Sequence, residues 1–369
     1  MSEITCGGLY LHLPFCRQKC QYCDFASFAG IQEHIDTYLS ALALEAQSYK
    51  KYRFDTLYVG GGTPSLLSVE QLEKLCGVVS ANFGPISSFS ESTLEANPES
   101  LSVEKLHFLH QQGFNRLSIG LQSLDNSVLK RIGRIHTAEM FLSAYEQARK
   151  TGFQNINVDL IAGLPGHSET QFLTGLKKVI SLAPQHISVY ALQVEEGTPF
   201  YRQGVQADED LIRREWEQTH FMLEEAGYTH YEISNFARPG YESKHNINYW
   251  RNGEYLGLGS AAASYQRGAR RSNSPAVLEY IRRMQTQQSP VDFSEELTGK
   301  AKEGETIMLG LRLLGGVRLS ARQQQLFSAE IADLLRLGLV EQKADLLKLT
   351  FEGMFLANQA FMAFVGPFA

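Results

Sequence analysis

Residues 10–25 read Y-L-H-L-P-F-C-R-Q-K-C-Q-Y-C-D-F and contain the most informative spacing in the chain. Cys16, Cys20 and Cys23 follow an apolar run and form a C-x3-C-x2-C pattern. Thiolates this close together in one loop can surround one corner of an inorganic cluster. A cubane iron–sulfur cluster takes one thiolate for each of its irons, so three cysteines leave one iron open to another ligand. We therefore expect these three cysteines to hold a [4Fe–4S] cluster.

Two other uses of cysteine compete with this interpretation. A structural zinc site usually takes its ligands as two closely spaced pairs, and the chain has no second C-x2-C pattern. Disulfides are disfavoured because the chain has only 5 cysteines in 369 residues and begins M-S-E-I-T-C-G-G, without an export signal. Zinc is therefore the alternative that stays open beside the cluster.

The composition limits the class of protein. A chain of 369 residues exceeds what one hydrophobic core usually organises, so we expect a large domain and a smaller one. No apolar run approaches the roughly 20 residues of a membrane-spanning helix, so we expect no transmembrane segment and a cytoplasmic, reducing location. The net charge is −6 without long runs of like charge, which argues against nucleic acid as a partner.

The first half of the chain repeats one pattern of short apolar run, loop and helix-period stretch. The apolar runs lie at 9–13, 56–59, 92–96, 116–121, 156–161 and 186–192, and the helical stretches at 33–52, 68–82, 102–112, 137–151 and 168–182. Alternating strands and helices indicate right-handed crossovers and a parallel sheet. The pattern predicts an α/β fold, namely a partial (β/α)6 barrel.

Beyond residue 192 the regular alternation of predicted strands and helices ends. We expect a loop at 195–201, a helix at 209–226, a strand-like run at 228–237, a polar and aromatic segment at 241–250, helices at 296–314, 320–327 and 328–338, and a strand at 346–350. Helices followed by a small β wing predict a mainly helical, winged-helix-like C-terminal domain. The predicted organisation is a core at 1–240, a connecting segment at 241–293 and a C-terminal domain at 294–369.

Polar and glycine residues gather where the predicted strands end, which is where a parallel barrel presents its chemistry. The second strand is followed by G-G-G-T-P at 60–64, and a glycine run lets backbone N–H groups face a ligand closely. Glu95 lies at the end of the third strand and could accept a hydrogen bond from an ammonium group or a ribose. Arg134 lies one helix beyond the fourth strand, where it could pair with a carboxylate.

Taken in order, the motifs resemble a known family. The cysteine spacing, with Tyr22 before the last cysteine, is similar to the signature of the radical S-adenosylmethionine superfamily. The succession Y-x-H-x-P-F-C-x3-C-x-Y-C, G-G-G-T-P, L-E-A-N-P, S-I-G-L-Q-S, V-D-L-I-x-G-L-P-G and S-V-Y-A-L resembles the oxygen-independent coproporphyrinogen III oxidase (HemN-like) family over nearly the whole chain. The resemblance extends to a HemN-type C-terminal domain.

This resemblance implies roles for particular residues. Cys16, Cys20 and Cys23 correspond to the cluster ligands. The implied S-adenosylmethionine contacts are Tyr10, Tyr22, Gly61, Gly62, Thr63, Glu95, Gln122, Arg134, Asp159 and Ala191. For each of the polar positions, the alternative is a structural residue that ties down a barrel loop.

Two features separate branches within the family. Coproporphyrinogen dehydrogenases read C-x3-C-x2-C-x-C, whereas this chain has Phe25 at the last position. Residues 245–250 read H-N-I-N-Y-W and resemble the H-N-x-x-Y-W motif of the HemW branch, whose members are haem chaperones. His245 is accordingly the candidate for haem contact, because histidine ligates haem iron and neighbouring aromatic rings can pack on a porphyrin. The alternative is that His245 and Trp250 pack between the two domains.

The resemblance implies a haem chaperone that binds haem and transfers it to an acceptor protein. Its cofactors would be the [4Fe–4S] cluster and an exchangeable S-adenosylmethionine, with haem as cargo and without enzymatic turnover. The principal alternative is an enzyme, an oxygen-independent coproporphyrinogen III dehydrogenase that performs radical oxidative decarboxylation. A related radical methyltransferase that opens haem would need a second S-adenosylmethionine site that the sequence does not reveal, and a structural metal-binding barrel without a redox role is the last alternative. No catalytic residue is assigned.

Overall fold

The centre of the molecule is a set of parallel strands, as the sequence predicts. The computed structural model describes residues 4–365; residues 1–3 and 366–369, at the outer ends of the first and last predicted domains, lie outside them. The six central strands are β1 (Ile4–Leu13), β4 (Tyr52–Gly61), β5 (Glu91–Ala96), β6 (Arg116–Gln122), β7 (Asn155–Ala162) and β8 (His186–Ala191). They lie side by side in this order and run parallel, so the six predicted strands and their orientation are confirmed.

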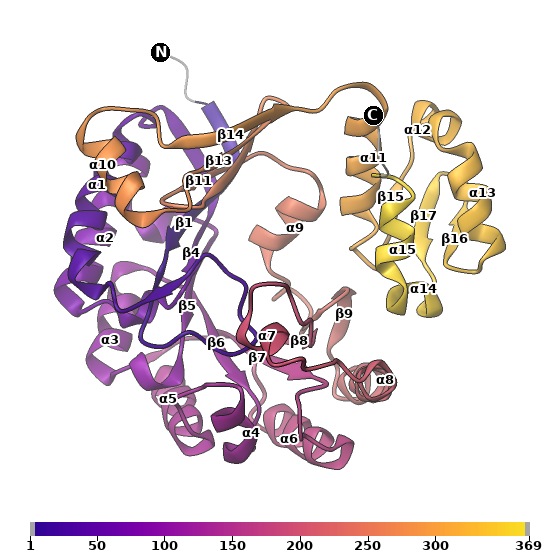
Figure 1. Cartoon of the computed structure of the whole chain (residues 1–369), viewed down its shortest axis with the longest axis horizontal. Coiled ribbons are helices and arrows are strands. Elements are labelled where there is room, and N and C mark those ends of the chain that lie inside the picture. Colours follow the sequence, from indigo (N-terminus) through magenta and orange to yellow (C-terminus); the bar gives the residue numbers. More distant parts are fainter. Residues whose placement is uncertain (1–3, 366–369) are drawn as a thin grey trace.

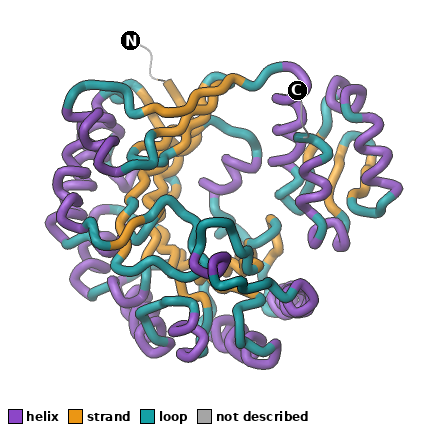
Figure 2. Tube along the Cα trace, viewed as in Figure 1, coloured by secondary structure: helices purple, strands orange, loops and turns teal. Residues whose placement is uncertain are grey.

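Helices cover the outer face of this curved sheet. They are α1 (Ile35–Gln47), α2 (Val69–Phe83), α3 (Val103–Gln112), α4 (Asn126–Arg131), α5 (Ala138–Thr151) and α6 (Glu169–Ser181). Figure 2 shows them outside the strands, where they bury the apolar outer face of the sheet. The hydroxyls of Ser68, Ser102 and Ser168 accept the expected N-cap hydrogen bonds. Gly113 and Gly152 end α3 and α5 in the left-handed conformation, which glycine adopts without strain.

Further strands extend the sheet at both edges. On the β8 side these are β10 (Asn235–Ala237) and β9 (Thr229–Glu232), and on the β1 side β11 (Tyr255–Leu258), β12 (Ala263–Gln266), β13 (Ala269–Asn273) and β14 (Val291–Glu296). Within the described residues β14 and β9 form the two edges of the sheet and do not pair with each other. The prediction of a partial barrel is therefore confirmed (Figure 1).

The predicted connecting segment contributes to this sheet. Residues 241–293 contain α9 (Lys244–Trp250), β11, β12, β13 and α10 (Val277–Gln285), and β11 pairs parallel with β1. The main hydrophobic core accordingly runs from Leu9 to Met284. The domain bounds at 240 and 293 stay a prediction.

A second hydrophobic core belongs to the C-terminal part of the chain. Its elements are α11 (Gly299–Gly310), β15 (Val317–Arg318), α12 (Ala321–Leu326), α13 (Ser328–Arg336), β16 (Val340–Lys343), β17 (Leu346–Leu349), α14 (Phe351–Phe355) and α15 (Ala357–Met362). A helix, a strand, two helices and a β-hairpin follow one another, which is the predicted winged-helix arrangement. The predicted start of the first helix at 296 is wrong, because residues up to Glu296 pair in β14.

The C-terminal domain contacts the barrel beside α8 (Glu209–Glu225), next to the short helix α7 (Pro199–Arg202) in sequence. The ring of Trp216 on α8 lies 4.8 Å from that of Phe355 on α14, edge to face. Beside it, Arg213 pairs with Glu352 at 2.7 Å.

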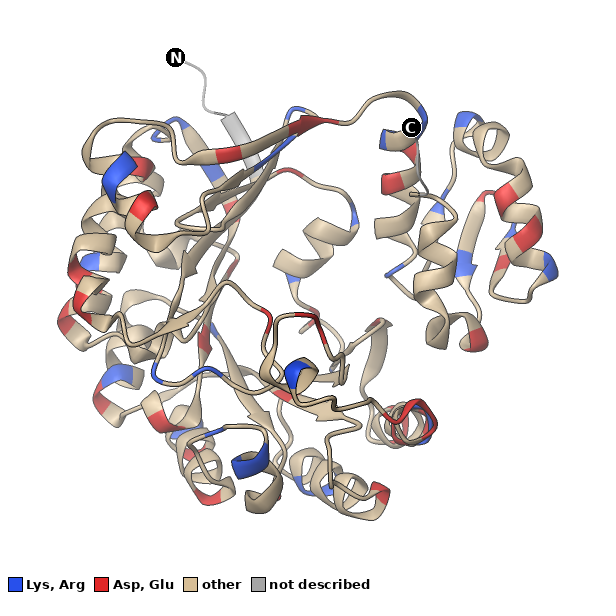
Figure 3. Ribbon diagram, in the orientation of Figure 1, with Lys and Arg blue, Asp and Glu red and all other residues tan. Residues whose placement is uncertain are grey.

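Figure 3 shows basic and acidic residues interspersed over the outer helices, in line with the absence of like-charge runs in the sequence. Among the described helices, none is both long and apolar enough to cross a membrane.

The α-helices α4, α7, α9 and α10 were not expected from the sequence. The helix α4 has only six residues and depends on Asp125, whose carboxylate accepts from the backbone N–H groups of Ser127 and Val128. The helix α9 lies on the inner side of the sheet and is polar and aromatic rather than amphipathic (Figure 1). Its sequence has no helical repeat of apolar residues, so the periodicity could not reveal it.

Candidate cofactor site

The three cysteines lie on a loop that a short parallel pair of strands closes. The strand β2 (Phe15–Cys16) pairs with β3 (Phe28–Ala29), so the intervening residues are gathered into one compact loop. Cys16 is buried, while Cys20 and Cys23 are half-buried. The loop follows β1 directly and therefore stands at the carboxyl end of the parallel strands.

Hydrogen bonds hold this loop in shape. The ammonium group of Lys19 donates to the carbonyl oxygens of Phe25 at 2.9 Å and Ser27 at 3.2 Å. The backbone N–H of Gln21 donates to the carbonyl of Ile132 at 3.0 Å, which ties the loop to the end of α4. The loop is thus preorganised by contacts that use none of its thiols.

The cysteines line a cavity of about 410 Å³ at the carboxyl ends of the strands. Of the residues predicted from the sequence, the cavity is lined by Cys16, Cys20, Cys23, Tyr22, Gly61, Gly62, Thr63, Glu95, Gln122, Arg134, Asp159 and Ala191. The fold therefore brings twelve of the fourteen predicted site residues to one place, from six different strands or the loops after them. Their assignment as cluster or S-adenosylmethionine contacts stays a prediction.

Tyr10 is not among the residues that line the cavity. Its hydroxyl lies 2.8 Å from Nδ1 of His12, and Nε2 of His12 lies 2.8 Å from the carbonyl oxygen of Ala26 in the cysteine loop. Because a carbonyl only accepts, Nε2 donates to it and Nδ1 accepts from the tyrosine. Tyr10 thus supports the loop through His12, and its direct contact with a cofactor stays a prediction.

The glycine run packs against the cysteine strand. An added Cβ at Gly62 would lie 2.6 Å from the carbonyl oxygen of Phe15, so only glycine allows this approach. The backbone N–H of Gly62 donates to Leu13, and that of Thr63 donates to Phe15, both at 2.8 Å. The N–H of Gly61 donates to Glu95 at 3.1 Å. The expectation that these N–H groups face a ligand is therefore wrong, because all three are used within the protein.

Two carboxyl groups line the cavity from β5 and β7, the strands on either side of β6. Glu95 accepts from the hydroxyl of Tyr58 at 2.8 Å, and Asp159 accepts from the side chain of Asn157 at 2.7 Å. Burial raises the pKa of Glu95 to about 7, and the charge of Asp159 adds to the rise although hydrogen bonds oppose it. Burial also raises the pKa of Asp159. An ammonium group that entered the cavity would meet these carboxyl groups and favour their ionised forms.

Arg134 supplies a buried positive charge to the cavity, which Lys19 also lines. Its Nη1 donates to Oδ1 of Asn97 at 2.8 Å, while its buried Nε has no partner. A buried donor without a partner is costly, and a carboxylate bound in the cavity would satisfy it. The space that Arg134 occupies exists because Gly120 has no side chain, since a Cβ there would lie 3.0 Å from Nη2.

Gln122 has a strained backbone. Its φ is 69°, in the left-handed region that residues with side chains rarely adopt, and the pairing of β6 with β7 shifts between Gly120 and Gln122. The shift turns the Gln122 side chain toward the cavity that it lines. Strain of this kind persists where the surroundings impose it, and it is common at binding sites.

Three thiols share the cavity with hydroxyl donors and a cation, and their binding of an iron–sulfur cluster stays a prediction. Burial raises the pKa of Cys16 and of Cys20, and hydrogen bonds from hydroxyls together with the charge of Arg134 oppose this rise. The hydroxyl of Thr63 lies 3.6 Å from Sγ of Cys16. In the described part of the chain, no three His, Cys, Asp or Glu side chains converge closely enough to ligate one metal ion. The fit therefore rests on three thiols, donors and a cation around one cavity.

Some residues at the cavity were not found from the sequence. They include Tyr58, Asn97, Ser118, Tyr190 and Gln193. Tyr58 and Ser118 lie inside strands, where alternation alone does not distinguish a cavity-facing residue from a buried one. Asn97 stands in the quoted motif L-E-A-N-P, so its position after the third strand was the available signal.

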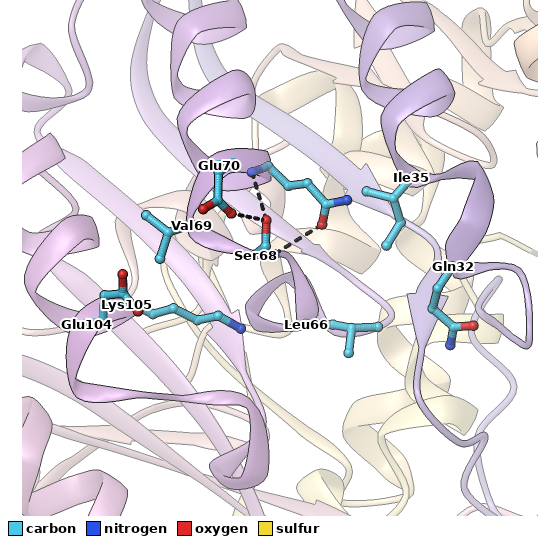
Figure 4. A pocket seen from close by; sticks show the side chains of 9 residues that line it. Gln32, Ile35, Leu66, Ser68, Val69, Glu70, Glu104 and Lys105 are labelled. Carbon is cyan, nitrogen blue, oxygen red and sulfur yellow. Dashed lines mark hydrogen bonds between the residues drawn. The ribbon is translucent and has the colours of Figure 1, made fainter.

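A second cavity, of about 500 Å³, lies beside the first turns of α2 and α3 (Figure 4). Its polar side chains are engaged in capping and loop contacts. The hydroxyl of Ser68 donates to Glu70 and accepts from the backbone N–H of Gln71, and Lys105 donates to the carbonyls of Ser65 and Ser100. These contacts account for the polar groups at the helix starts without a ligand, so we assign no site here.

The helix α9 contains the H-N-I-N-Y-W segment and is anchored by a buried carboxylate. Glu91, the first residue of β5, accepts from the backbone N–H groups of Lys244 and His245, both at 3.1 Å, and from the hydroxyl of Ser243 at 3.3 Å. A carboxylate at a helix N-terminus accepts from N–H groups that have no partner within the helix, and its negative charge interacts favourably with the positive end of the helix dipole. This contact between distant parts of the chain explains why the segment is helical.

His245 is enclosed by the protein. It is only 1% exposed, its Nδ1 lies 2.8 Å from Oγ1 of Thr56, and its Nε2 lies 2.8 Å from the hydroxyl of Tyr249. Its ring also stacks on Tyr58 at 5.1 Å, and burial lowers its pKa to about 3. In this structure both ring nitrogens are hydrogen-bonded and His245 packs between α9 and the sheet, and a haem contact at this residue stays a prediction.

Trp250 lies at the other end of α9, against the C-terminal domain. The guanidinium of Arg312 stands over its ring at 4.3 Å. This contact agrees with the alternative considered for the segment, in which the histidine and tryptophan pack inside the molecule. The motif thus joins the barrel to the C-terminal domain.

Comparisons with known families match the two parts of the chain separately. Residues 10–179 match the radical SAM superfamily, and residues 297–356 match the HemN C-terminal domain. These matches confirm the predicted combination of a radical SAM barrel with a C-terminal HemN-type domain.

Individual relatives cover almost the whole chain. The chain is 37% identical to the protein named heme chaperone HemW of Bacillus subtilis, over 97% of this chain and 98% of that protein. It is 41% identical to heme chaperone HemW of Escherichia coli, over 71% of each. Among solved structures, coproporphyrinogen III oxidase (HemN) from Escherichia coli, described as a radical SAM enzyme, superposes with a TM-score of 0.86 at 25% identity, covering 98% of this chain and 91% of that one.

Proposed function

The chain belongs to the HemW family of the radical SAM superfamily, and from this premise we propose that it is a haem chaperone with a cofactor pocket in its barrel. In this proposal it binds haem and passes it to an acceptor protein. The observation that carries the cofactor part is the single cavity that three cysteines share with Glu95 and Arg134.

The cluster would be held by Cys16, Cys20 and Cys23. With three protein ligands, a [4Fe–4S] cluster keeps one iron open, and a reduced cluster with S-adenosylmethionine can supply radical chemistry. The residues of this chain would bind and orient: Arg134 offers an unpartnered donor to a carboxylate, and Glu95 offers a carboxylate to an ammonium group. Zinc would need a fourth ligand that the sequence spacing does not provide.

The remaining predicted contacts support this arrangement. Tyr22, Gly61, Gly62, Gln122, Asp159 and Ala191 would form the walls around S-adenosylmethionine, because they line the same cavity. The cysteines need a reducing compartment to stay available for iron, so we propose a cytoplasmic location. We do not place haem at His245, because both of its ring nitrogens are hydrogen-bonded within the protein.

A second function has one observation in its favour. The fold is shared over 98% of the chain with HemN, a coproporphyrinogen III oxidase. However, the position of the additional cysteine in those enzymes carries Phe25, whose side chain is 67% exposed at the mouth of the cavity. Phe25 cannot supply a thiol, so we rank the oxidative decarboxylation of coproporphyrinogen III second.

An anaerobic assay separates the two functions. Reconstituted protein would be incubated with reductant, S-adenosylmethionine and coproporphyrinogen III, and the products analysed for protoporphyrinogen and 5′-deoxyadenosine. The chaperone proposal predicts no decarboxylated product, together with haem binding and transfer of haem to an apo haem protein in a parallel mixture. Stoichiometric or greater formation of protoporphyrinogen would instead assign the enzyme.

A further inference from the structure

Three hydrogen bonds connect Arg134 to the first cysteine of the loop. Nη1 of Arg134 lies 2.8 Å from Oδ1 of Asn97, and Nδ2 of Asn97 lies 3.1 Å from Oγ1 of Thr63. Oγ1 of Thr63 lies 3.6 Å from Sγ of Cys16. These residues come from three loops after successive strands, so the fold assembles the chain of contacts.

The chemistry of the groups fixes the direction of this relay. A guanidinium only donates, so the atom of Asn97 that faces it is the amide oxygen. The amide nitrogen then donates to Thr63, whose oxygen accepts it, and the hydroxyl hydrogen of Thr63 is left to point at the sulfur. Every donor therefore points from the cation toward Cys16, and hydrogen bonds aligned in this way polarise one another.

The surroundings hold the relay in place and keep water from replacing it. Thr63 is only 4% exposed, and its backbone N–H is fixed to Phe15 at 2.8 Å. The backbone N–H of Asn97 donates to the hydroxyl of Ser65 at 3.1 Å. Gly120 leaves the room that the other side chains need, since a Cβ there would lie 3.2 Å from Oδ1 of Asn97.

We propose that Asn97 and Thr63 are positioning residues that relay the charge of Arg134 to Cys16 and thereby set the reduction potential of the cluster. The inference rests on the proposed role of Cys16 as a cluster ligand. One-electron reduction places additional negative charge on the cluster and its sulfur ligands. A donor aimed at one of these sulfurs stabilises the reduced state more than the oxidised state, and so raises the potential.

The test is a redox titration of anaerobically reconstituted protein, followed by electron paramagnetic resonance and carried out without S-adenosylmethionine. Thr63→Val keeps the shape of the side chain and removes the final donor. At a fixed solution potential we expect the ratio of reduced to oxidised cluster to fall about tenfold. This corresponds to a decrease of about 59 mV in the reduction potential of a one-electron couple. Thr63→Ser keeps the hydroxyl and should retain the wild-type potential.

A matched control is available on the same sheet. Thr93 is fully buried in β5, and its hydroxyl has no hydrogen-bond partner, so Thr93→Val makes the same chemical change away from the sulfur. This variant should leave the potential unchanged. A shift as large as that of Thr63→Val would contradict the relay, because it would trace the effect to the loss of any buried hydroxyl.

A second variant keeps the test decisive if Thr63→Val does not load iron. Asn97→Ala leaves every atom that touches Cys16 in place and interrupts the relay one step earlier, so it should lower the potential by a smaller amount. An unchanged potential in an iron-loaded Asn97→Ala or Thr63→Val variant would overturn the relay and leave the cluster assignment standing. Failure of the wild-type protein to take up a cluster would instead overturn the proposed cofactor.

Discussion

The two ends of the parallel strands contain the two motifs of the sequence, and they are built in opposite ways. At the carboxyl end, the cysteine loop, Glu95 and Arg134 face a shared cavity, and Nε of Arg134 has no partner. Toward the amino end, Glu91 holds the start of α9, and both nitrogens of His245 are hydrogen-bonded. A side chain with hydrogen-bonding capacity to spare, such as Arg134, can bind a ligand, whereas one that is paired on both sides, such as His245, stabilises the fold; in the same motif Nε1 of Trp250 also has no partner.

Tyr58 marks the boundary between these two regions. Its ring stacks on His245 at 5.1 Å, and its hydroxyl donates to Glu95 at 2.8 Å. One side of this residue thus belongs to the packed interior and the other to the cavity. The contrast yields predictions that separate effects on cofactors from effects on stability.

The largest effect is expected at the cysteine loop. Cys16→Ala should reduce the iron content of anaerobically reconstituted protein from about four irons per chain to nearly none, because two thiols cannot hold the cluster. Iron and acid-labile sulfide analysis measures this directly. Cys76, a buried thiol on α2 outside the loop, provides the control, and Cys76→Ser should load normally. A full cluster in Cys16→Ala would refute the ligand assignment.

The next largest effect is expected on the stability of the protein, at His245 in α9. His245→Ala should lower the free energy of unfolding by about 2–4 kcal/mol, because it opens a cavity and removes the hydrogen bonds of the imidazole with Thr56 and Tyr249. Urea denaturation of the apo protein measures the change. His107→Ala, at an exposed position on α3, should stay within about 0.5 kcal/mol of the wild type. Wild-type stability combined with weakened haem binding would show that His245 is a ligand after all.

A pH dependence is expected in the cavity. Glu95 has a pKa of about 7, so it is neutral in more acidic solution and a carboxylate in more basic solution. The affinity for the ammonium group of S-adenosylmethionine should therefore rise between roughly pH 6 and pH 7.5, before that amine itself loses its proton near pH 8. Calorimetric titration should show this rise, and Glu95→Gln should flatten it and weaken binding about tenfold. A pH dependence of undiminished size between pH 6 and pH 7.5 in Glu95→Gln would exclude this role.

The smallest effect is expected at the rim of the cavity. Phe25 is 67% exposed, so Phe25→Ala should change the free energy of unfolding by less than about 0.5 kcal/mol. Thermal or chemical denaturation provides the measurement. A decrease in the free energy of unfolding as large as that of His245→Ala would contradict the placement of Phe25 at an open rim of the cavity.

Much of the barrel could be predicted because its signals are local. Apolar runs predict the strands, serine N-caps such as Ser68 mark the helix starts, and glycines such as Gly152 mark the ends. The cavity could be predicted as well, because residues after successive parallel strands meet at one edge of the sheet. Tyr10 stands apart from the cavity because it acts on the loop through His12.

The rest depends on contacts between distant parts of the chain. The helix α9 is held by Glu91, which lies about 150 residues earlier, and no local pattern reveals that contact. The use of the Gly62 N–H by Leu13, and the relay from Arg134 to Cys16, likewise appear only once the strands are side by side. Residue types could suggest the chemistry, but which hydrogen-bonding groups remain free is a property of the folded chain.

Hydrogen–deuterium exchange of the reconstituted protein, with and without S-adenosylmethionine under anaerobic conditions, tests this contrast most directly. We predict slower exchange on binding in the cysteine loop at 16–27 and in the strand ends at 60–63 and 95–97, and unchanged exchange in α9 at 244–250. Protection of residues 244–250 without protection of the cysteine loop would contradict this prediction.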